Sequence, residues 1–224
     1  MPSSSTAPPP HPHDTFPNGP CLNFLAHLHL SDGTPGSMIG GIAADFVKGP
    51  QVAALPAGIR AGIHLHRQVD GFTDRHPVVQ RSIGRIAEGY QWFSGIIIDI
   101  YYDHILARDW ERYTTEPLAT FAARSYVALE TLLPQLPPEA HEFVRRFIDD
   151  DRLIRYATPE GIEDTLARVS RRIALRIPSR VVRLEDAMPD LLDKHIALAA
   201  DFHSFYPELI AFANQCKANA QGPR

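Results

Sequence analysis

The chain has 224 residues, of which 44% are hydrophobic and 21% are charged, and its formal net charge is −4. This length and apolar content suffice for one well-packed core with at most a small appendage. The slightly acidic balance gives no global indication of nucleic-acid binding. No run of about 18 apolar residues indicates a membrane span, and the N-terminus lacks the basic and apolar regions of a signal peptide.

The cysteines favour a reducing compartment. Cys21 and Cys216 are the only two, lie near opposite ends of the chain and form no CxxC pair. A disulfide framework or a zinc ribbon is therefore not expected, and we predict a cytoplasmic protein.

The domain organisation follows from a change in composition near residue 21. Residues 1–20 are rich in proline and almost free of aliphatic side chains, which is typical of a disordered or polyproline-like tail. Residues 21–218 show helical patterns throughout, without alternating strands, internal repeats, a glycine-rich phosphate loop or a nucleophile elbow. We therefore predict a single all-α domain, a multi-helix bundle, followed by a flexible C-terminus at residues 219–224.

The first predicted helix covers residues 22–30. It is apolar except for polar insertions that include Asn23 and His27, which lie one helical turn apart. This spacing indicates a buried helix with one polar stripe. A histidine on such a face is more often a satisfied core residue than a metal ligand.

The next predicted helix is capped by Ser37, runs through Val47 and stops at Gly49-Pro50. Asp45 would then be an acid inside an apolar helix. Such an acid is costly unless a cation or hydrogen-bond donors meet it, so Asp45 is a candidate for a functional role.

The central helix, residues 55–72, carries the most concentrated polar chemistry. His66 and Asp70 are four residues apart and share a helix face, where an imidazole and a carboxylate can hold one metal ion or exchange a proton. His64 lies about 160° around the helix from His66, so the two cannot both be ligands on one straight helix. Arg67 lies at the edge of the His66 face. The alternative interpretation is a polar helix face with a surface His–Asp pair.

Residues 78–90 read as an amphipathic helix, and residues 92–106 as a buried one. In the second, Asp99 and Asp103 are one turn apart and His104 follows. Two stacked carboxylates repel each other and are not expected in an apolar helix for stability alone. A divalent cation would remove this conflict.

The remaining helices are predicted at residues 118–133, 138–149, 151–156, 161–172, 184–200 and 201–218. Among them lies a stretch with no acidic residue, which contains Arg168, Arg171, Arg172, Arg176, Arg180 and Arg183. It is either a solvated helix face or a docking surface for a phosphate group or an acidic protein.

The polar insertions in apolar helices can be considered together. Mixed imidazole and carboxylate ligands suit manganese, iron or zinc better than calcium. The adjacent Asp103-His104 pair resembles, in reversed order, the His-Asp pair of metal-dependent phosphohydrolases with all-α scaffolds. Such a site would activate water and clamp a phosphoryl oxygen, and Arg67 could neutralise the phosphate.

The sequence also resembles the acyl carrier protein phosphodiesterases, which are similar to HD-type hydrolases. The matching segments are residues 23–28 (NFLAHL), 41–49 (GIAADFVKG), 62–74 (GIHLHRQVDGFTD), 99–107 (DIYYDHILA) and 205–207 (FYP). The likeness extends over roughly residues 22–218, with the segments in order and at similar spacing. The proline-rich tail has no counterpart in it, and the arginine stretch is matched only loosely.

This resemblance implies a fold like that of the HD-type hydrolases. It also implies hydrolysis of the phosphodiester that joins 4'-phosphopantetheine to a serine of holo-acyl carrier protein, with manganese as the usual metal. The expected metal ligands are His66, Asp70, Asp99 and Asp103, with Asp45 as a further candidate. The expected catalytic residues are His27, His64, His104 and Arg67, of which His27 and His104 could either complete the metal shell or move protons. Acyl carrier proteins are strongly acidic, so the expected docking residues are Arg168, Arg171, Arg172 and Arg176.

Two alternatives remain open at the level of sequence. The first keeps the fold and the metal but acts on a nucleotide or another small phosphoester. The second is a non-catalytic helical module that binds an acidic protein through the arginines. Metal content separates them, because a binding module has no need of Asp99 and Asp103.

Overall fold

The computed structural model describes residues 24–176 and 182–221, and these residues form helices and connecting turns without a β-strand. The predicted all-α class is therefore confirmed. The α-helices are α2 (Phe24–Leu30), α3 (Pro35–Ala43), α4 (Pro50–Ala53), α5 (Ala57–Thr73), α6 (Pro77–Tyr90), α7 (Ser94–Arg108), α8 (Leu118–Leu132), α9 (Pro138–Asp149), α10 (Arg152–Arg155), α11 (Pro159–Arg176), α12 (Met188–Asp193) and α13 (His195–Gln221). Short 3₁₀ turns η1 (Gln91–Phe93), η2 (Trp110–Arg112), η3 (Leu133–Gln135) and η4 (Leu184–Ala187) connect some of them.

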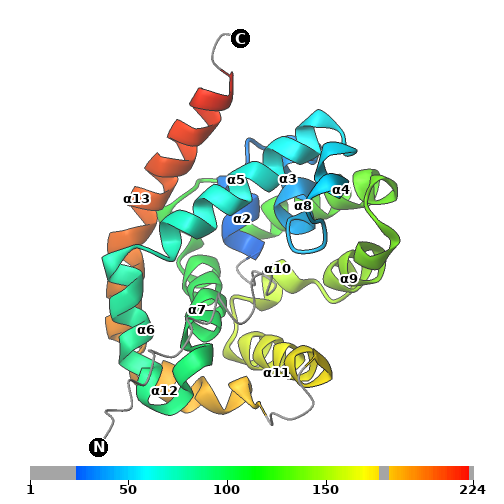
Figure 1. Ribbon diagram of the computed structural model, residues 1–224. Coiled ribbons are helices and arrows are strands. Elements are labelled where there is room, and N and C mark those ends of the chain that lie inside the picture. The colour runs from blue at the N-terminus through cyan, green and yellow to red at the C-terminus, as the bar shows by residue number, and fades with distance from the viewer. Residues whose placement is uncertain (1–23, 177–181, 222–224) are drawn as a thin grey trace, which may run out of the picture.

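Helix α7 forms the centre of the molecule and is buried on almost every side. It packs against α2, α6, α11 and α13, and in Figure 1 it runs between the long α13 and the α9–α11 region. The three consecutive isoleucines of α7 therefore belong to a buried helix, as the spacing of its acidic residues predicts. Because α7 lies in the core, its polar side chains must find partners inside the protein.

Helices α3 and α5 approach each other more closely than ordinary side chains allow. A Cβ atom on Gly62 would lie 2.4 Å from the carbonyl oxygen of Ser37 and 2.9 Å from the Cα atom of Gly40. Glycines at these two positions thus let the two backbones touch. This contact fixes α5, which carries His66 and Asp70, against the end of α3.

The end of α3 differs from the prediction. The helix begins after Thr34, whose side-chain oxygen accepts a hydrogen bond from the Ser37 amide, and it stops at Ala43. The Ala43 carbonyl then accepts hydrogen bonds from the amides of both Phe46 and Val47, which closes a turn. Asp45 therefore lies in this turn and not inside a helix, because backbone geometry ends the helix before the apolar pattern ends.

The C-terminal part also departs from the predicted boundaries. The segment predicted as one helix over residues 184–200 divides into η4, α12 and the start of α13, and the break comes at Lys194. Helix α13 then continues without interruption past Pro207 to Gln221. Helix α13 thus extends three residues beyond the predicted end at residue 218. The predicted proline-rich tail lies outside the described residues, as do Cys21 and Asn23.

Across the described ranges 24–176 and 182–221, no helix combines the length and the apolar character needed to cross a membrane.

Candidate metal centre

Two imidazoles and one carboxylate from different helices converge at one point, which we call the metal triad: His27, His66 and Asp70. His27 comes from α2, and the other two come from α5. The Asp70 Oδ1 atom lies 3.1 Å from His27 Nε2, and its Oδ2 atom lies 3.0 Å from His66 Nε2. The two imidazole rings stack at a centroid distance of 3.9 Å. One potential ligand atom from each residue lies within 4.8 Å of the others.

Two further acids adjoin the metal triad. Asp45, in the turn after α3, has a side chain that is 5% exposed, and its Oδ1 atom lies 3.8 Å from His66 Nε2. Asp99, on α7, feels the negative charges of Asp74, Asp70 and Asp103; burial and these charges raise the pKa of Asp99 well above its usual range. Carboxyl groups thus cluster around the triad.

The pKa shifts of the three residues of the metal triad show that they interact with one another. Burial and the neighbouring His66 lower the pKa of His27 to about 4. Burial also opposes charge on His66, but the carboxylate of Asp70 outweighs it and raises the His66 pKa. Burial likewise opposes charge on Asp70, and the two imidazoles outweigh it and lower the Asp70 pKa. These effects favour the carboxylate form of Asp70 and favour a proton on His66 over one on His27.

These residues fit a divalent transition metal. Two imidazole nitrogens and one carboxylate form a common ligand set for manganese, iron or zinc with positions left open for substrate. Asp45 and Asp99 offer further carboxyl oxygens, and a nearby cation would favour their ionised form. The Nδ1 atom of His66 is buried with no partner at hydrogen-bonding geometry, although the Gly41 carbonyl lies near enough to raise the His66 pKa.

Asp103 has a different part in this structure from the ligand role that its spacing predicts. It is fully buried on α7, where its Oδ2 and Oδ1 atoms accept hydrogen bonds from the amides of Leu25 and Ala26 at 2.8 and 2.9 Å. These amides belong to the first turn of α2, whose N–H groups have no partner within the helix. Both oxygens of Asp103 are thus engaged, and the residue holds the helix that carries His27.

Comparison with known proteins places this arrangement in a family. Residues 22–209 match the model of the acyl carrier protein phosphodiesterase family. The chain is 33% identical to the acyl carrier protein phosphodiesterase of Escherichia coli O157:H7 over 202 residues, which cover 87% of this chain and 98% of that protein. The protein of the same name from Shigella boydii serotype 4 is 33% identical over 201 residues, or 86% and 98% of the two chains. The chain belongs to the acyl carrier protein phosphodiesterase family. No solved structure matches it significantly, so the likeness to HD-type hydrolases stays a prediction.

Within this acyl carrier protein phosphodiesterase fold, three predicted catalytic residues lie apart from the metal triad. His64 is exposed on α5, on another face from the buried His66. His104 is buried on α7, and its Nδ1 atom lies 2.8 Å from the Tyr156 carbonyl oxygen; burial lowers the pKa of His104. Arg67 is exposed and donates a hydrogen bond from Nη2 to the Val47 carbonyl at 3.2 Å, which places it beside the turn that carries Asp45.

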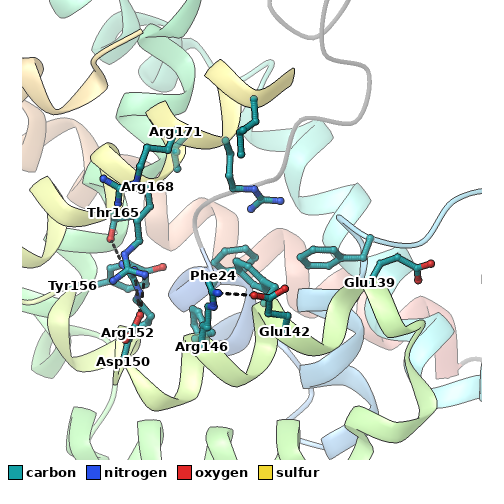
Figure 2. Close-up of a pocket in the computed structure, with 16 residues that line it drawn as sticks. Phe24, Glu139, Glu142, Arg146, Asp150, Arg152, Tyr156, Thr165, Arg168 and Arg171 are labelled. Carbon is teal, nitrogen blue, oxygen red and sulfur yellow. Dashed lines mark hydrogen bonds and ion pairs between the residues drawn. The ribbon is translucent and has the colours of Figure 1, made fainter. Parts of the chain in front are cut away.

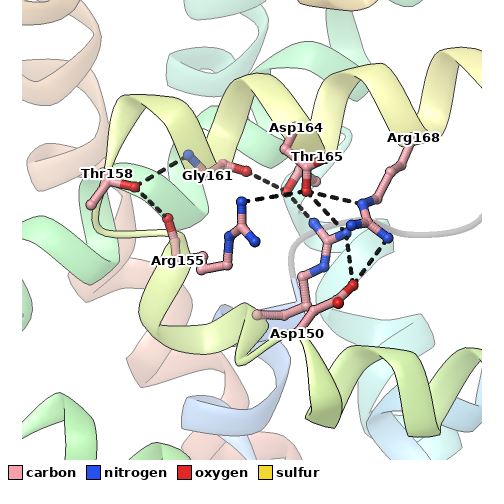
Figure 3. Close-up of polar contacts among 8 residues, drawn as sticks. Asp150, Arg155, Thr158, Gly161, Asp164, Thr165 and Arg168 are labelled. Atoms are coloured by element: carbon pink, nitrogen blue, oxygen red, sulfur yellow. Dashed lines mark hydrogen bonds and ion pairs between the residues drawn. The ribbon is translucent and has the colours of Figure 1, made fainter.

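The predicted docking arginines differ in their ion pairs and in their exposure. Arg168 is paired with Asp164 at 2.9 Å and with Asp150 at 3.0 Å. Figure 3 shows both acids facing Arg168. The buried Arg152 pairs with the same two acids. The prediction overlooked these acids because Asp164 precedes the arginine stretch and Asp150 comes from another helix. Arg168 is therefore engaged in ion pairs within the fold, and its part in a docking surface stays a prediction.

The other docking candidates lie farther along α11. Arg171 is exposed. Arg172 is half-buried, with its guanidinium 5.5 Å from the ring centroid of Phe143 and 6.0 Å from that of Phe46. The side chain of Arg176, like Arg180 as a whole, lies outside the part of the chain that the structure describes.

Sequence reasoning did not anticipate the cavity that these arginines border. It has a volume of about 520 Å³ and lies between α9 and α11. Figure 2 shows side chains of the two helices facing each other across it. Phe24, Phe46 and Phe143 line it. The available signal was the position of two of these rings: Phe46 directly follows Asp45, and Phe24 precedes His27 by one helical turn.

Proposed function

We propose that this protein uses a divalent cation, manganese in the first place, to hydrolyse the phosphodiester between 4'-phosphopantetheine and the serine of holo-acyl carrier protein. The products are the apo carrier and free 4'-phosphopantetheine. Membership of the acyl carrier protein phosphodiesterase family supports the substrate. The single structural observation that carries the proposal is the convergence of His27, His66 and Asp70 on one point.

Different residues of the chain have different roles in the proposed reaction. When bound, a divalent cation polarises a phosphoryl oxygen and lowers the pKa of water. The metal triad holds the cation, and Asp45 and Asp99 are further candidates that would complete its surroundings. Arg67 lies beside the Asp45 turn with its side chain exposed, where its guanidinium can bind the substrate phosphate. Asp103 positions His27 through the first turn of α2.

The carrier protein is proposed to dock on the exposed face of α11. Arg171 and Arg172 border the cavity there, and Arg176 follows one turn after Arg172. These cations suit an acidic helical partner, and long-range attraction between opposite charges speeds association. The proposal includes a cytoplasmic location and an HD-type fold. It also includes a role in the turnover of the carrier proteins of fatty-acid metabolism.

The experiment that tests the proposal measures the intact mass of the carrier. Purified protein is incubated with holo-acyl carrier protein and manganese. We expect the carrier to lose the mass of the phosphopantetheine group, and expect no loss with a chelator or with Asp70→Asn. Asp193→Asn, an exposed acid at the end of α12, serves as the matched control and should behave as wild type.

Two other results would contradict the proposal in different ways. An unchanged carrier mass, from metal-loaded protein that cleaves bis(4-nitrophenyl) phosphate, would favour a small phosphodiester as substrate. Folded protein that takes up no metal would favour a binding module for an acidic protein.

A further inference from the structure

The cavity between α9 and α11 has an aromatic interior. The Phe143 ring from α9 lies 5.3 Å from the Phe24 ring and 5.0 Å from the Phe46 ring, measured between centroids. Phe147 packs edge-on against Phe24 at 5.5 Å. Val169 of α11 lines the same space. Its volume of about 520 Å³ is within the range of about 300–1,000 Å³ that is typical of small-molecule sites.

Most charged side chains that line the cavity already have partners. Arg152 and Arg168 are held by Asp150 and Asp164, and Arg146 pairs with Glu142. Arg171 has no ion pair with any described residue and lies exposed at the rim (Figure 2). Arg172 lies over the Phe143 and Phe46 rings, and the acid Glu139 is exposed on the α9 side. The phenyl rings can therefore contact the uncharged part of a ligand, with the cations Arg171 and Arg172 on the α11 side.

The cavity is connected to the metal centre through two elements. Phe46 lines the cavity and directly follows Asp45, whose carboxylate lies 3.8 Å from His66. Phe24 lines the cavity, and His27, one turn later on α2, belongs to the metal triad. Side chains three residues apart lie on the same side of a helix. The cavity and the metal centre thus share two elements, α2 and the turn after α3.

We propose that this cavity holds the pantetheine part of the substrate, the uncharged chain of two amides that ends in the thiol, while the phosphate lies at the metal centre. This inference rests on the proposed function. The methylene and methyl groups of this chain can pack against the phenyl rings, while its amides need positions where polar side chains or water can bind them. The carboxylates of an acidic carrier would lose hydration against phenyl rings, so they stay at the rim with Arg171. Arm and carrier are thereby recognised by separate parts of α11.

The first test fills the cavity. Val169 is 4% exposed and lines it, so Val169→Phe places a larger side chain in the proposed position of the arm. We expect kcat/KM for holo-acyl carrier protein to fall at least tenfold, with hydrolysis of bis(4-nitrophenyl) phosphate unchanged. The control Val127→Phe changes an exposed valine of α8 in the same way and should leave both activities at the wild-type level.

Binding of pantetheine itself, which lacks the phosphate, gives a readout independent of activity. We expect saturation-transfer NMR to detect its binding to wild type and to Val127→Phe but not to Val169→Phe. Leu175→Trp is a second variant, because Leu175 lines the cavity yet is 83% exposed and its replacement should not disturb folding. It should weaken pantetheine binding at least threefold.

Three outcomes would overturn the inference. The first is that pantetheine does not bind to wild type, and the second is that it still binds to both Val169→Phe and Leu175→Trp. The third is that both variants lose as much activity on a carrier whose serine bears only a short alkyl phosphodiester as they lose on holo-acyl carrier protein. That result would assign the cavity to the carrier protein. Failure of the proposed function is distinct, because wild type would then leave every carrier intact.

Discussion

Asp70 is the residue on which the metal triad depends, because its two carboxylate oxygens meet two different imidazoles. Its side chain is 31% exposed, while those of His27 and His66 are 2% and 3% exposed. Asp70 is thus the member of the triad that opens toward solvent.

We predict that Asp70→Asn lowers manganese affinity by at least about 100-fold, since even residues that only support metal ligands typically contribute about 10–100-fold. Isothermal titration calorimetry on the chelator-treated protein measures the change. Asp193→Asn should retain wild-type affinity, and an equal loss in that variant would point to a nonspecific effect of charge.

Asp103 supports the metal triad indirectly, because it holds the helix α2 that carries His27. We predict that Asp103→Ala lowers the free energy of unfolding by about 2–4 kcal/mol, because it leaves two buried amides of α2 without acceptors, and each such group costs about 1–3 kcal/mol. Urea denaturation measures this loss, which should be the same with and without chelator. A loss seen only in the presence of metal would instead identify Asp103 as a ligand.

At the scale of elements, the contact between α3 and α5 sets the position of His66 and Asp70. We predict that Gly62→Ala destabilises the protein by about 1–3 kcal/mol or more, because the added methyl group would overlap the Ser37 carbonyl of α3. Gly84 lies in α6 with open space around it, so Gly84→Ala should stabilise by up to about 1 kcal/mol. Denaturation curves of the two variants compare them directly, and equal effects would refute the role of the close approach.

A second pair of elements is joined by Asp201 of α13. Its Oδ1 atom accepts a hydrogen bond from Arg81 Nη2 at 2.6 Å, and its Oδ2 atom accepts bonds from Ser82 and Arg85 at 2.9 and 2.8 Å. Burial alone would raise the pKa of Asp201, but these three donors from α6 lower it to about 2.

This shift predicts how stability depends on pH. The folded pKa lies below the ordinary value of 3.8, so the stabilisation is fully present above about pH 4 and is lost as pH falls toward 2. We expect about 1–2 kcal/mol, after allowance for solvent screening at the half-exposed Arg81. Asp201→Asn should remove this amount at pH 6 but little at pH 2.5. Urea denaturation at the two pH values tests it, and a pH-independent difference would contradict it.

At the scale of the whole molecule, the metal triad ties α2 to α5, which lie side by side in Figure 1. A cation that binds only the folded chain stabilises it by mass action. We predict that manganese at 100 times its Kd raises the free energy of unfolding by about 2.7 kcal/mol. Thermal denaturation should show a rise in Tm that a chelator reverses and that Asp70→Asn abolishes. A rise of the same size in Asp70→Asn would place the cation elsewhere.

The fold was predictable to the extent that it depends on local pattern. Helix α9 has the predicted bounds, and α5 and α6 differ from theirs by at most two residues at either end. The boundaries that failed are those set by backbone turns, as after Ala43 and at Lys194, and the predicted division between residues 200 and 201, which α13 does not have. Sequence spacing indicates two site pairs, and both are local because each needs only one helical turn. His66 and Asp70 meet at the metal triad, whereas Asp103 of the Asp99–Asp103 pair accepts hydrogen bonds from α2.

What the sequence determined by itself was the all-α class, the family and the His66–Asp70 pair, because these depend on periodicity and on ordered motifs. Only the tertiary structure shows that His27 lies beside Asp70 and that Asp103 accepts hydrogen bonds from the start of α2. The same holds for the ion pair between Arg168 and Asp150 and for the cavity between α9 and α11. The physical reason is that hydrogen bonding within a helix acts over a few residues. Which helix faces contact each other across the core depends instead on packing between segments that are distant in the chain.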